Sequence, residues 1–221
     1  MICDLHRRHF ILTASGSALA GLYGTTAMAQ KAAPARPQVI LVLGDSLSAE
    51  YGLARGTGWV ALLEKRLAQE KIAATVVNAS VSGETTSGGR SRLAALLAQH
   101  QPSQVVIELG GNDALRGLPL KNTEENLSWM VQTALKSGAK VLLVGMQVPP
   151  NYGTDYANKF AGLFTSVAQA QKAAVVPFFL KGVADGPDPT RLFQPDRIHP
   201  RAEAHPQMLA NVWPELQKLL R

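Results

Sequence analysis

Five short apolar runs, separated by longer segments of helical periodicity, constrain the fold of this chain more than any other feature. The runs span residues 39–43, 74–78, 104–109, 140–146 and 174–179, and they are rich in Val, Ile and Leu on both faces. Such strands are typical of a parallel sheet that helices cover on both sides. We therefore expect an α/β fold of three layers with a five-stranded parallel sheet. Strand order leaves no direct mark in the sequence, and the flavodoxin-like order is the expected one.

The segments between these runs favour helices. Apolar residues recur about every 3.6 positions in 57–70, 90–100, 123–138 and 158–173. In the first segment Trp59, Leu62, Leu63 and Leu67 share one face. Gly138 is expected to end the third helix, and Pro200 is expected to open a last helix at its first turn.

The first 29 residues have the features of an export signal. Arg7 and Arg8 precede a weakly apolar stretch at 10–20, and Ala-Met-Ala at 27–29 is a small-x-small cleavage site. The stretch is too short, and too often interrupted by Gly, Ser and Thr, to span a bilayer, which disfavours a membrane anchor. The paired arginines resemble a twin-arginine signal, although His6 replaces the usual Ser or Thr. We expect a periplasmic or secreted protein, exported by the twin-arginine or the general secretory route.

Composition narrows the class of the remaining chain. An Ala/Pro linker at 30–38 precedes one domain at 39–221. The single cysteine, Cys3, leaves with the signal, so neither a disulfide nor a thiolate metal site is expected. The formal net charge is +6, but the basic residues are scattered, which argues against a nucleic-acid partner. Ordinary solubility explains this charge, with mild attraction to anionic surfaces as the alternative, and we expect a monomer.

Polar blocks follow four of the five predicted strands. They are GDSLS at 44–48, NASVSG at 78–83, GGND at 110–113 and DRIHP at 196–200. Because the carboxyl ends of parallel strands meet at one edge of a sheet, these blocks are expected to lie together. They supply a hydroxyl, a glycine N–H, a side-chain amide and an Asp/His pair, which are the groups that acyl transfer requires.

Within these blocks Ser46 is the candidate nucleophile, with an ordinary helix N-cap as the alternative interpretation. His199 could take its proton, and Asp196, three residues earlier, could hold the other ring nitrogen. Three donors could stabilise an oxyanion: the N–H of Ser46 at the expected helix start, the N–H of Gly83 and the side-chain amide of Asn112. A glycine at 83 would let the backbone approach a substrate closely.

The four blocks, in this order and spacing, resemble those of the SGNH hydrolases, also called the GDSL lipase/esterase family. The stretches NASVSGETTSGG, ELGGNDALRGLP and VPPNYGTDYANKF resemble the subgroup of acyl-CoA thioesterase I, lysophospholipase and arylesterase. The resemblance covers the chain from about residue 39 to its end. It implies the flavodoxin-like fold, no cofactor, Ser46 as nucleophile with Asp196 and His199, and Gly83 and Asn112 as oxyanion donors. Arg197 stands where many relatives have a small residue.

Other polar residues near the blocks have structural interpretations. Asp45 is expected to stabilise its own turn, and Asp113 to cap the segment that follows it, while Glu108 is also expected to be structural. His100 and His205 are expected at the surface or at helix ends. No metal site is expected, because the sequence has no HxH, HExxH or carboxylate cluster. The glycine-rich 87–91 lacks the Lys-Ser/Thr pair of a phosphate cradle.

Two long loops, 114–120 and 147–160, are expected to flank the site. An acyl chain could lie on their apolar side chains, which are Leu115, Leu118, Leu120, Pro149, Pro150, Tyr152 and Tyr156. In the resembling subgroup the corresponding loops form the acyl pocket, and the loop after GGND moves on binding. The alternative is that these side chains only pack the loops down.

The sequence therefore predicts a serine hydrolase that cleaves fatty acyl or aryl esters and thioesters through an acyl-enzyme on Ser46. Lysophospholipids and other lipids suit an exported enzyme better than cytoplasmic acyl-CoA. A carbohydrate O-acetylesterase of the cell envelope is a second possibility, against which the apolar loops argue. A non-catalytic binding protein on the same scaffold is the third, and it should have lost Ser46, Asp196 or His199, all of which are present.

Overall fold

The sheet of the computed structural model, which describes residues 38–221, has the order β2-β1-β3-β4-β5. Its strands are β1 (Gln38–Gly44), β2 (Ala74–Asn78), β3 (Gln104–Glu108), β4 (Lys140–Val144) and β5 (Ala174–Val176). All four neighbouring pairs are parallel. This is the flavodoxin-like arrangement, so the predicted fold class is confirmed. The expected export signal lies outside the described residues, as does the expected linker except for Gln38, which begins β1.

The last strand is shorter than its apolar run predicts. β5 ends at Val176, although the run continues to residue 179, because Pro177 has no N–H to continue the ladder. The neighbouring strand ends at the same level, where the N–H of Gly145 donates to Val176 O at 2.7 Å. The N–H of Phe179 then donates to Gly145 O at 2.8 Å, which turns the chain away from the sheet.

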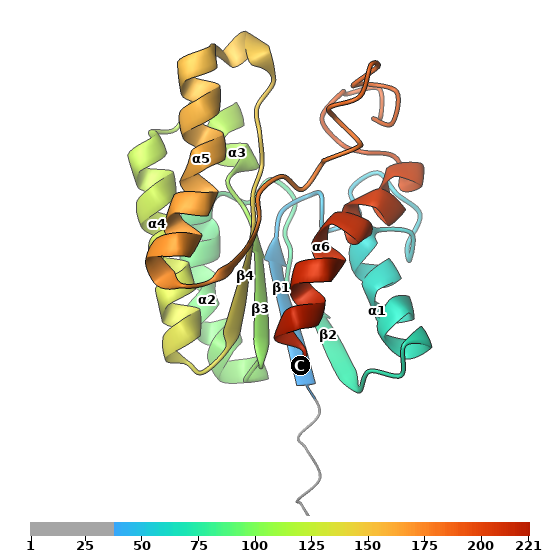
Figure 1. Cartoon of the computed structure of the whole chain (residues 1–221), viewed down its shortest axis with the longest axis vertical. Coiled ribbons are helices and arrows are strands. Elements are labelled where there is room, and N and C mark those ends of the chain that lie inside the picture. Colours follow the sequence, from blue (N-terminus) through green and yellow to red (C-terminus); the bar gives the residue numbers. More distant parts are fainter. Residues whose placement is uncertain (1–37) are drawn as a thin grey trace, which may run out of the picture. The chain divides into compact units, whose positions relative to one another are not determined.

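Helices cover both faces of the sheet (Figure 1). One face carries α1 (Trp59–Gln69) and α6 (His205–Leu219), and the other carries α2 (Thr86–His100), α4 (Leu120–Lys136) and α5 (Thr154–Gln171). Three shorter pieces complete the chain: α3 (Gly111–Leu115) and the 3-10 turns η1 (Pro150–Tyr152) and η2 (Ala202–Ala204). No helix within this described part is long and apolar enough to cross a membrane.

The helices α2, α4 and α5 begin three or four residues before the predicted segments. Their first turns are largely polar and lack the apolar spacing on which the prediction depended. Thr85 caps α2 through its side chain, which accepts from Gly88 N at 3.4 Å. Gly138 follows the end of α4 with φ of +90°, in the role that the sequence predicted for it.

The predicted role of Pro200 is wrong. It forms an isolated antiparallel bridge with Phe193, and α6 begins later, at His205, with Pro206 in its first turn. Two backbone hydrogen bonds hold this bridge: Gln194 N donates to His199 O at 2.7 Å, and Arg201 N donates to Leu192 O at 2.7 Å. Pairing with residues 192–194 thus competes with helix formation at this position.

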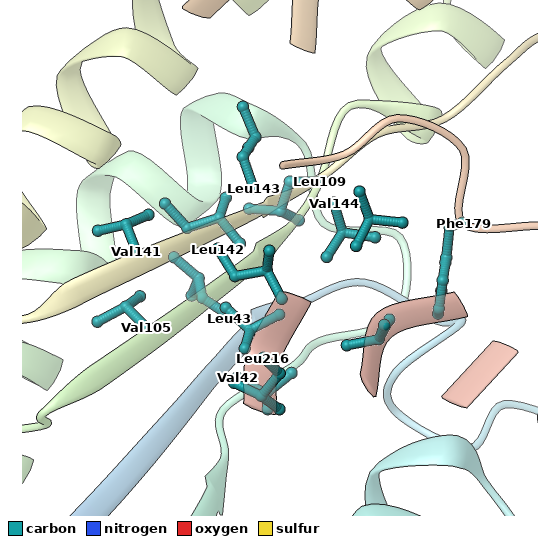
Figure 2. Close-up of a cluster of buried hydrophobic side chains, with 14 of the residues drawn as sticks. Val42, Leu43, Val105, Leu109, Val141, Leu142, Leu143, Val144, Phe179 and Leu216 are labelled. Carbon is teal, nitrogen blue, oxygen red and sulfur yellow. The ribbon is translucent and has the colours of Figure 1, made fainter. Parts of the chain in front are cut away.

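The core fills the space between the sheet and its helices. Figure 2 shows side chains of three strands, among them Val42, Val105 and Leu142, packed near Leu216 of α6. All four are fully buried, and each such side chain contributes about 1.5–3 kcal/mol relative to an exposed one. This packing fixes the strands whose carboxyl ends carry the polar blocks.

Residues at the amino ends of two strands form hydrogen bonds with the last residues of the chain. The side chain of Gln38 donates to Leu220 O at 3.0 Å, and Lys140 Nζ donates to Leu219 O at 2.8 Å and to Arg221 O at 2.7 Å. The start of β1 and the last turn of α6 are therefore neighbours. The polar blocks lie beyond the opposite, carboxyl ends of the parallel strands.

Candidate functional site

The segment that carries Ser46 is a series of turns rather than the start of a helix. The N–H groups of Ser48 and Ala49 donate to Asp45 O at 3.2 and 3.0 Å, but α1 begins only at Trp59. The expectation that Ser46 opens a helix is therefore wrong. The turns do not continue into a helix because Glu50 and Gly52 adopt φ of +58° and +69°. The carboxylate of Glu50 then accepts from the N–H groups of Gly56 and Gly58, which fixes the loop.

Two buried carboxyl groups shape this turn. Asp45 accepts from Leu47 N at 3.0 Å, as predicted, and also from the side-chain amide of Asn112 at 3.0 Å. Glu108 accepts from the Ser48 hydroxyl at 2.8 Å and from Asp45 N at 3.4 Å. Burial raises the pKa of Asp45 to about 6. Burial, followed by the neighbouring Asp45 charge, raises the pKa of Glu108 well above its ordinary value.

Ser46, His199 and Asp196 lie in one hydrogen-bonded chain. The Ser46 Oγ is 2.9 Å from His199 Nε2, and His199 Nδ1 is 2.6 Å from Asp196 Oδ2. The partial burial of Asp196 by itself would raise the pKa of its carboxyl group. Hydrogen bonds from Ile198 N–H, the His199 ring and His199 N–H outweigh this effect and lower the pKa to about 2. An ionised Asp196 can only accept, so Nδ1 carries the ring proton and Nε2 is free to accept from the Ser46 hydroxyl.

The sequence around His199 builds this geometry locally. Asp196 Oδ1 accepts from Ile198 N at 3.0 Å and from His199 N at 3.1 Å, so the carboxylate folds back on the residues that follow it. Arg197 sits between them with φ of +59°, a left-handed conformation that costs free energy in a residue with a Cβ. The side chain of Arg197 is exposed and takes no part in the Asp196–His199 contact.

The three predicted oxyanion donors lie in the segments that follow β1, β2 and β3. The backbone N–H groups of Ser46 and Gly83 have no acceptor within residues 38–221. Asn112 lies in the short helix α3, and one of its two amide hydrogens goes to Asp45. Gly83 adopts φ of +76°, so a left-handed backbone, rather than lack of space for a Cβ, is what requires glycine here.

Asp113 has another role than predicted, whereas His205 lies at a helix end, which is one of its two predicted positions. Asp113 does not cap its own helix, because its carboxylate accepts from the N–H and the hydroxyl of Thr86, at the start of α2, and from the Thr123 hydroxyl of α4. His205 is a helix-end residue but not a surface one: it is buried, and its Nδ1 accepts from Trp59 N at 3.0 Å. His100 ends α2, as expected.

The predicted substrate-binding residues divide into two groups. Leu115 and Leu118, three and six residues after Asn112, are exposed by 46% and 36%, and Pro149 is also exposed. In contrast, Leu120 begins α4 and packs partly against the core. Tyr152 stacks on Tyr156, with ring centroids 6.1 Å apart.

The two flanking loops are shorter than predicted. The helix α3 extends to Leu115, and α4 begins at Leu120. Residues 147–160 contain η1, in which Pro150 lies, and the first turns of α5. The described residues hold no group of three or more His, Cys, Asp or Glu side chains that could bind a metal.

Three residues that the sequence did not single out contact the site. The guanidinium of Arg116 donates to Gly83 O at 2.7 Å and thus joins the loop after β3 to the loop after β2. The ring of Tyr51 lies against His199, with centroids 4.3 Å apart. The side chain of Gln194 donates to Tyr51 O at 2.9 Å. Each contact spans segments distant in sequence, so no local pattern marks it.

Comparisons with known proteins show to which family the chain belongs. The family model of the GDSL-like Lipase/Acylhydrolase family matches residues 42–206. The esterase TesA of Pseudomonas aeruginosa is 50% identical over 202 residues, which are 91% of this chain and 98% of the relative. An arylesterase of Vibrio mimicus is 42% identical, covering 86% and 93%. The thioesterase 1/protease 1/lysophospholipase L1 of Escherichia coli K12 is 39% identical, covering 84% and 86%.

Solved structures show the same likeness. A crystal structure of TesA superposes with a TM-score of 0.79 at 52% identity, over 82% of this chain and 99% of the other. The psychrotrophic esterase EstA from a Pseudoalteromonas species, inhibited by monoethylphosphonate, superposes with a TM-score of 0.76 at 39% identity, over 83% and 98%. The family match spans all four polar blocks and both ends of the Ser46–His199 contact. The chain therefore belongs to the GDSL-like lipase/acylhydrolase family of SGNH hydrolases.

Proposed function

We propose that this protein is an exported serine hydrolase that cleaves acyl and aryl esters and thioesters, with Ser46, His199 and Asp196 as its catalytic triad. The observation that carries the proposal is the chain of hydrogen bonds from Ser46 Oγ through the His199 ring to Asp196. The names of the relatives, an esterase, an arylesterase and a thioesterase/lysophospholipase, support this substrate class.

In the proposed mechanism His199 Nε2 takes the hydroxyl proton as Ser46 Oγ attacks the substrate carbonyl carbon. The resulting oxyanion accepts hydrogen bonds from Ser46 N–H, Gly83 N–H and the second amide hydrogen of Asn112. His199 then donates its proton to the leaving alkoxide, phenolate or thiolate, and the acyl group stays on Ser46. Water, deprotonated by His199, then attacks the acyl carbon; the bond from this carbon to Ser46 Oγ breaks, His199 returns the proton to Ser46 Oγ, and the carboxylic acid is released. Asp196 holds the ring and stabilises its positive charge throughout.

Exposed Leu115 and Leu118 support a preference for apolar acyl chains. They lie three and six residues after Asn112, so the acyl chain of an acyl group on Ser46 could pass over them. Lysophospholipids are then the substrates that best suit an exported enzyme. The export itself rests on the signal-like features of residues 1–29, the arginine pair among them.

The test is hydrolysis of para-nitrophenyl esters from acetate to palmitate by the wild-type protein and by Ser46→Ala. We expect activity that rises toward medium or long chains and falls by several orders of magnitude in Ser46→Ala. Asn112→Ala should lower kcat by about 10²–10³-fold, as expected for the loss of one oxyanion donor. Full activity in a folded Ser46→Ala variant would refute the mechanism. Activity confined to acetate would favour a deacetylase instead.

A further inference from the structure

The irregular segment that carries Asp196 and His199 needs a support outside itself. It lies between β5, which ends at Val176, and the short turn η2, which begins at Ala202. The hydrogen bonds among Asp196, Ile198 and His199 fix the ring relative to its carboxylate only. They do not fix this pair relative to Ser46, which lies 153 residues earlier in the chain.

Gln194 connects the two segments through hydrogen bonds on both sides. Its side-chain nitrogen donates to Tyr51 O at 2.9 Å and to Pro200 O at 3.2 Å. Both partners are backbone carbonyl oxygens, which only accept, so the amide nitrogen must be the atom that faces them. Its backbone N–H donates to His199 O at 2.7 Å.

The same contacts reach the backbone of Ser46. The N–H of Tyr51 donates to Ser46 O at 3.3 Å, and the carbonyl of the same residue accepts from Gln194. A continuous path therefore leads from the Ser46 carbonyl through Tyr51 and Gln194 to the His199 carbonyl. The Tyr51 ring, 4.3 Å from the His199 ring between centroids, adds a contact parallel to this path.

Gly52 is adapted to the same arrangement. It has φ of +69°, and a Cβ built there would overlap the Gln194 side-chain oxygen. Only glycine leaves room for the amide to approach the Tyr51 carbonyl. Gln194 itself is partly buried, so water competes less for these bonds than it would at an exposed position.

We propose that Gln194 is a positioning residue that holds His199 at hydrogen-bonding distance from Ser46. The inference deepens the proposed function and rests on it, since it concerns the geometry of the same serine and histidine. Without the side-chain amide, the segment around His199 would lose its hydrogen bond to the Tyr51 carbonyl, and the ring would sample positions away from the hydroxyl.

The experiment measures how fast Ser46 reacts with diethyl para-nitrophenyl phosphate, which releases one nitrophenolate per active serine. This small probe depends on the Ser46–His199 geometry and has no acyl chain to bind. Gln194→Leu keeps the approximate size of the side chain but removes both of its donated bonds. Gln207→Leu is the matched control, because Gln207 is exposed on α6 and its amide donates only to Asn211.

We expect the phosphorylation rate and the kcat for para-nitrophenyl acetate to fall together in Gln194→Leu, by about 10–100-fold. The KM and the near-ultraviolet circular dichroism should stay close to wild type, and Gln207→Leu should match wild type in every measurement. A folded Gln194→Leu that reacts as fast as the wild-type protein would overturn the inference.

A second variant covers the case in which Gln194→Leu does not fold. Gln194→Asn retains an amide but is shorter by one methylene, so it cannot reach both carbonyls; the inference requires it to react slowly as well, and wild-type speed would overturn it. A wild-type protein that neither reacts with the phosphate ester nor hydrolyses the acetate would instead refute the proposed function.

Discussion

Asn112 is held in place by a carboxylate, and this contact makes Asp45 important for the proposed oxyanion site. Asp45 accepts from Leu47 N with one oxygen and from the Asn112 amide with the other. An asparagine at 45 has only one acceptor oxygen, so its own NH₂ group would face one of these two donors. Asp45 directly precedes Ser46 in sequence, but its effect on the site is to hold the Asn112 amide in position.

We predict that Asp45→Asn lowers kcat for para-nitrophenyl butyrate by about 10–100-fold, approaching the effect of removing one oxyanion donor. The double variant Asp45→Asn/Asn112→Ala separates this route from others. It should be no slower than Asn112→Ala alone, because the two residues act as one unit. Losses that simply multiply in the double variant would show that Asp45 acts independently of Asn112.

At the residue scale, the sequence alone predicts the site residues whose side-chain chemistry the proposed reaction requires. A serine, an Asp/His pair and an asparagine that follow separate strands can be recognised without coordinates, and the structure brings these residues together. Gln194 and Arg116 could not be recognised, because each donates to a backbone carbonyl of a distant segment. Every residue has such a carbonyl, so the partner leaves no trace in the sequence.

At the scale of elements, the first turn of α1 depends on a residue from another helix. Trp59 N donates to Nδ1 of the buried His205, at the start of α6, whereas the N-cap residue Gly58 has no side chain that could serve. Burial lowers the pKa of His205, which keeps the ring neutral and able to accept. A protonated ring would carry hydrogens on both nitrogens and could no longer accept this bond.

We expect His205→Ala to lower the free energy of unfolding by about 1–2 kcal/mol near pH 8, through the lost cap. The contribution of His205 is complete above its ordinary pKa of 6.5 and is lost as the pH falls through its lowered value. Urea denaturation should therefore show a smaller difference between wild type and variant at pH 5 than at pH 8. His100→Ala, at the end of α2, is the control. A difference that grows toward acid pH would contradict this account.

Several ends of helices and strands could not be predicted from the local apolar pattern of the sequence. The five strands followed from their apolar runs and four of the main helices from apolar periodicity, whereas the last helix was expected only from Pro200. The starts of α2, α4 and α5 did not follow from this periodicity, since capping and packing extend a helix into polar residues. The end of β5 depends on the missing N–H of Pro177, and the late start of α6 depends on the Phe193–Pro200 bridge, a pairing outside any regular element.

For the whole molecule, Glu108 makes stability depend on pH in the direction opposite to His205. Burial raises its pKa, so the folded protein resists an ionisation that the unfolded chain undergoes near pH 4.5. This cost is absent at lower pH and increases as the pH rises. Both hydrogen bonds that Glu108 accepts end on a single oxygen, which a glutamine could also offer.

We predict that the free energy of unfolding of Glu108→Gln, measured relative to wild type, increases from pH 4 to pH 8. The comparison between the two pH values matters here, because a buried NH₂ group adds its own pH-independent cost. Glu124→Gln, on the exposed side of α4, is the matched control and should show no such change. A constant difference across this range would mean that Glu108 carries no burial cost.

The hydrogen bond between Gln38 and the carbonyl of Leu220 has a consequence for the connectivity of the chain. Because the start of β1 and the end of α6 meet at the edge of the sheet away from Ser46, a short linker could join Arg221 to Gln38. New termini could then be opened at Gly138, where a built Cβ meets nothing within 4 Å. Such a circular permutant should retain the strand order and the Ser46–His199 contact, since neither depends on where the polypeptide is cut.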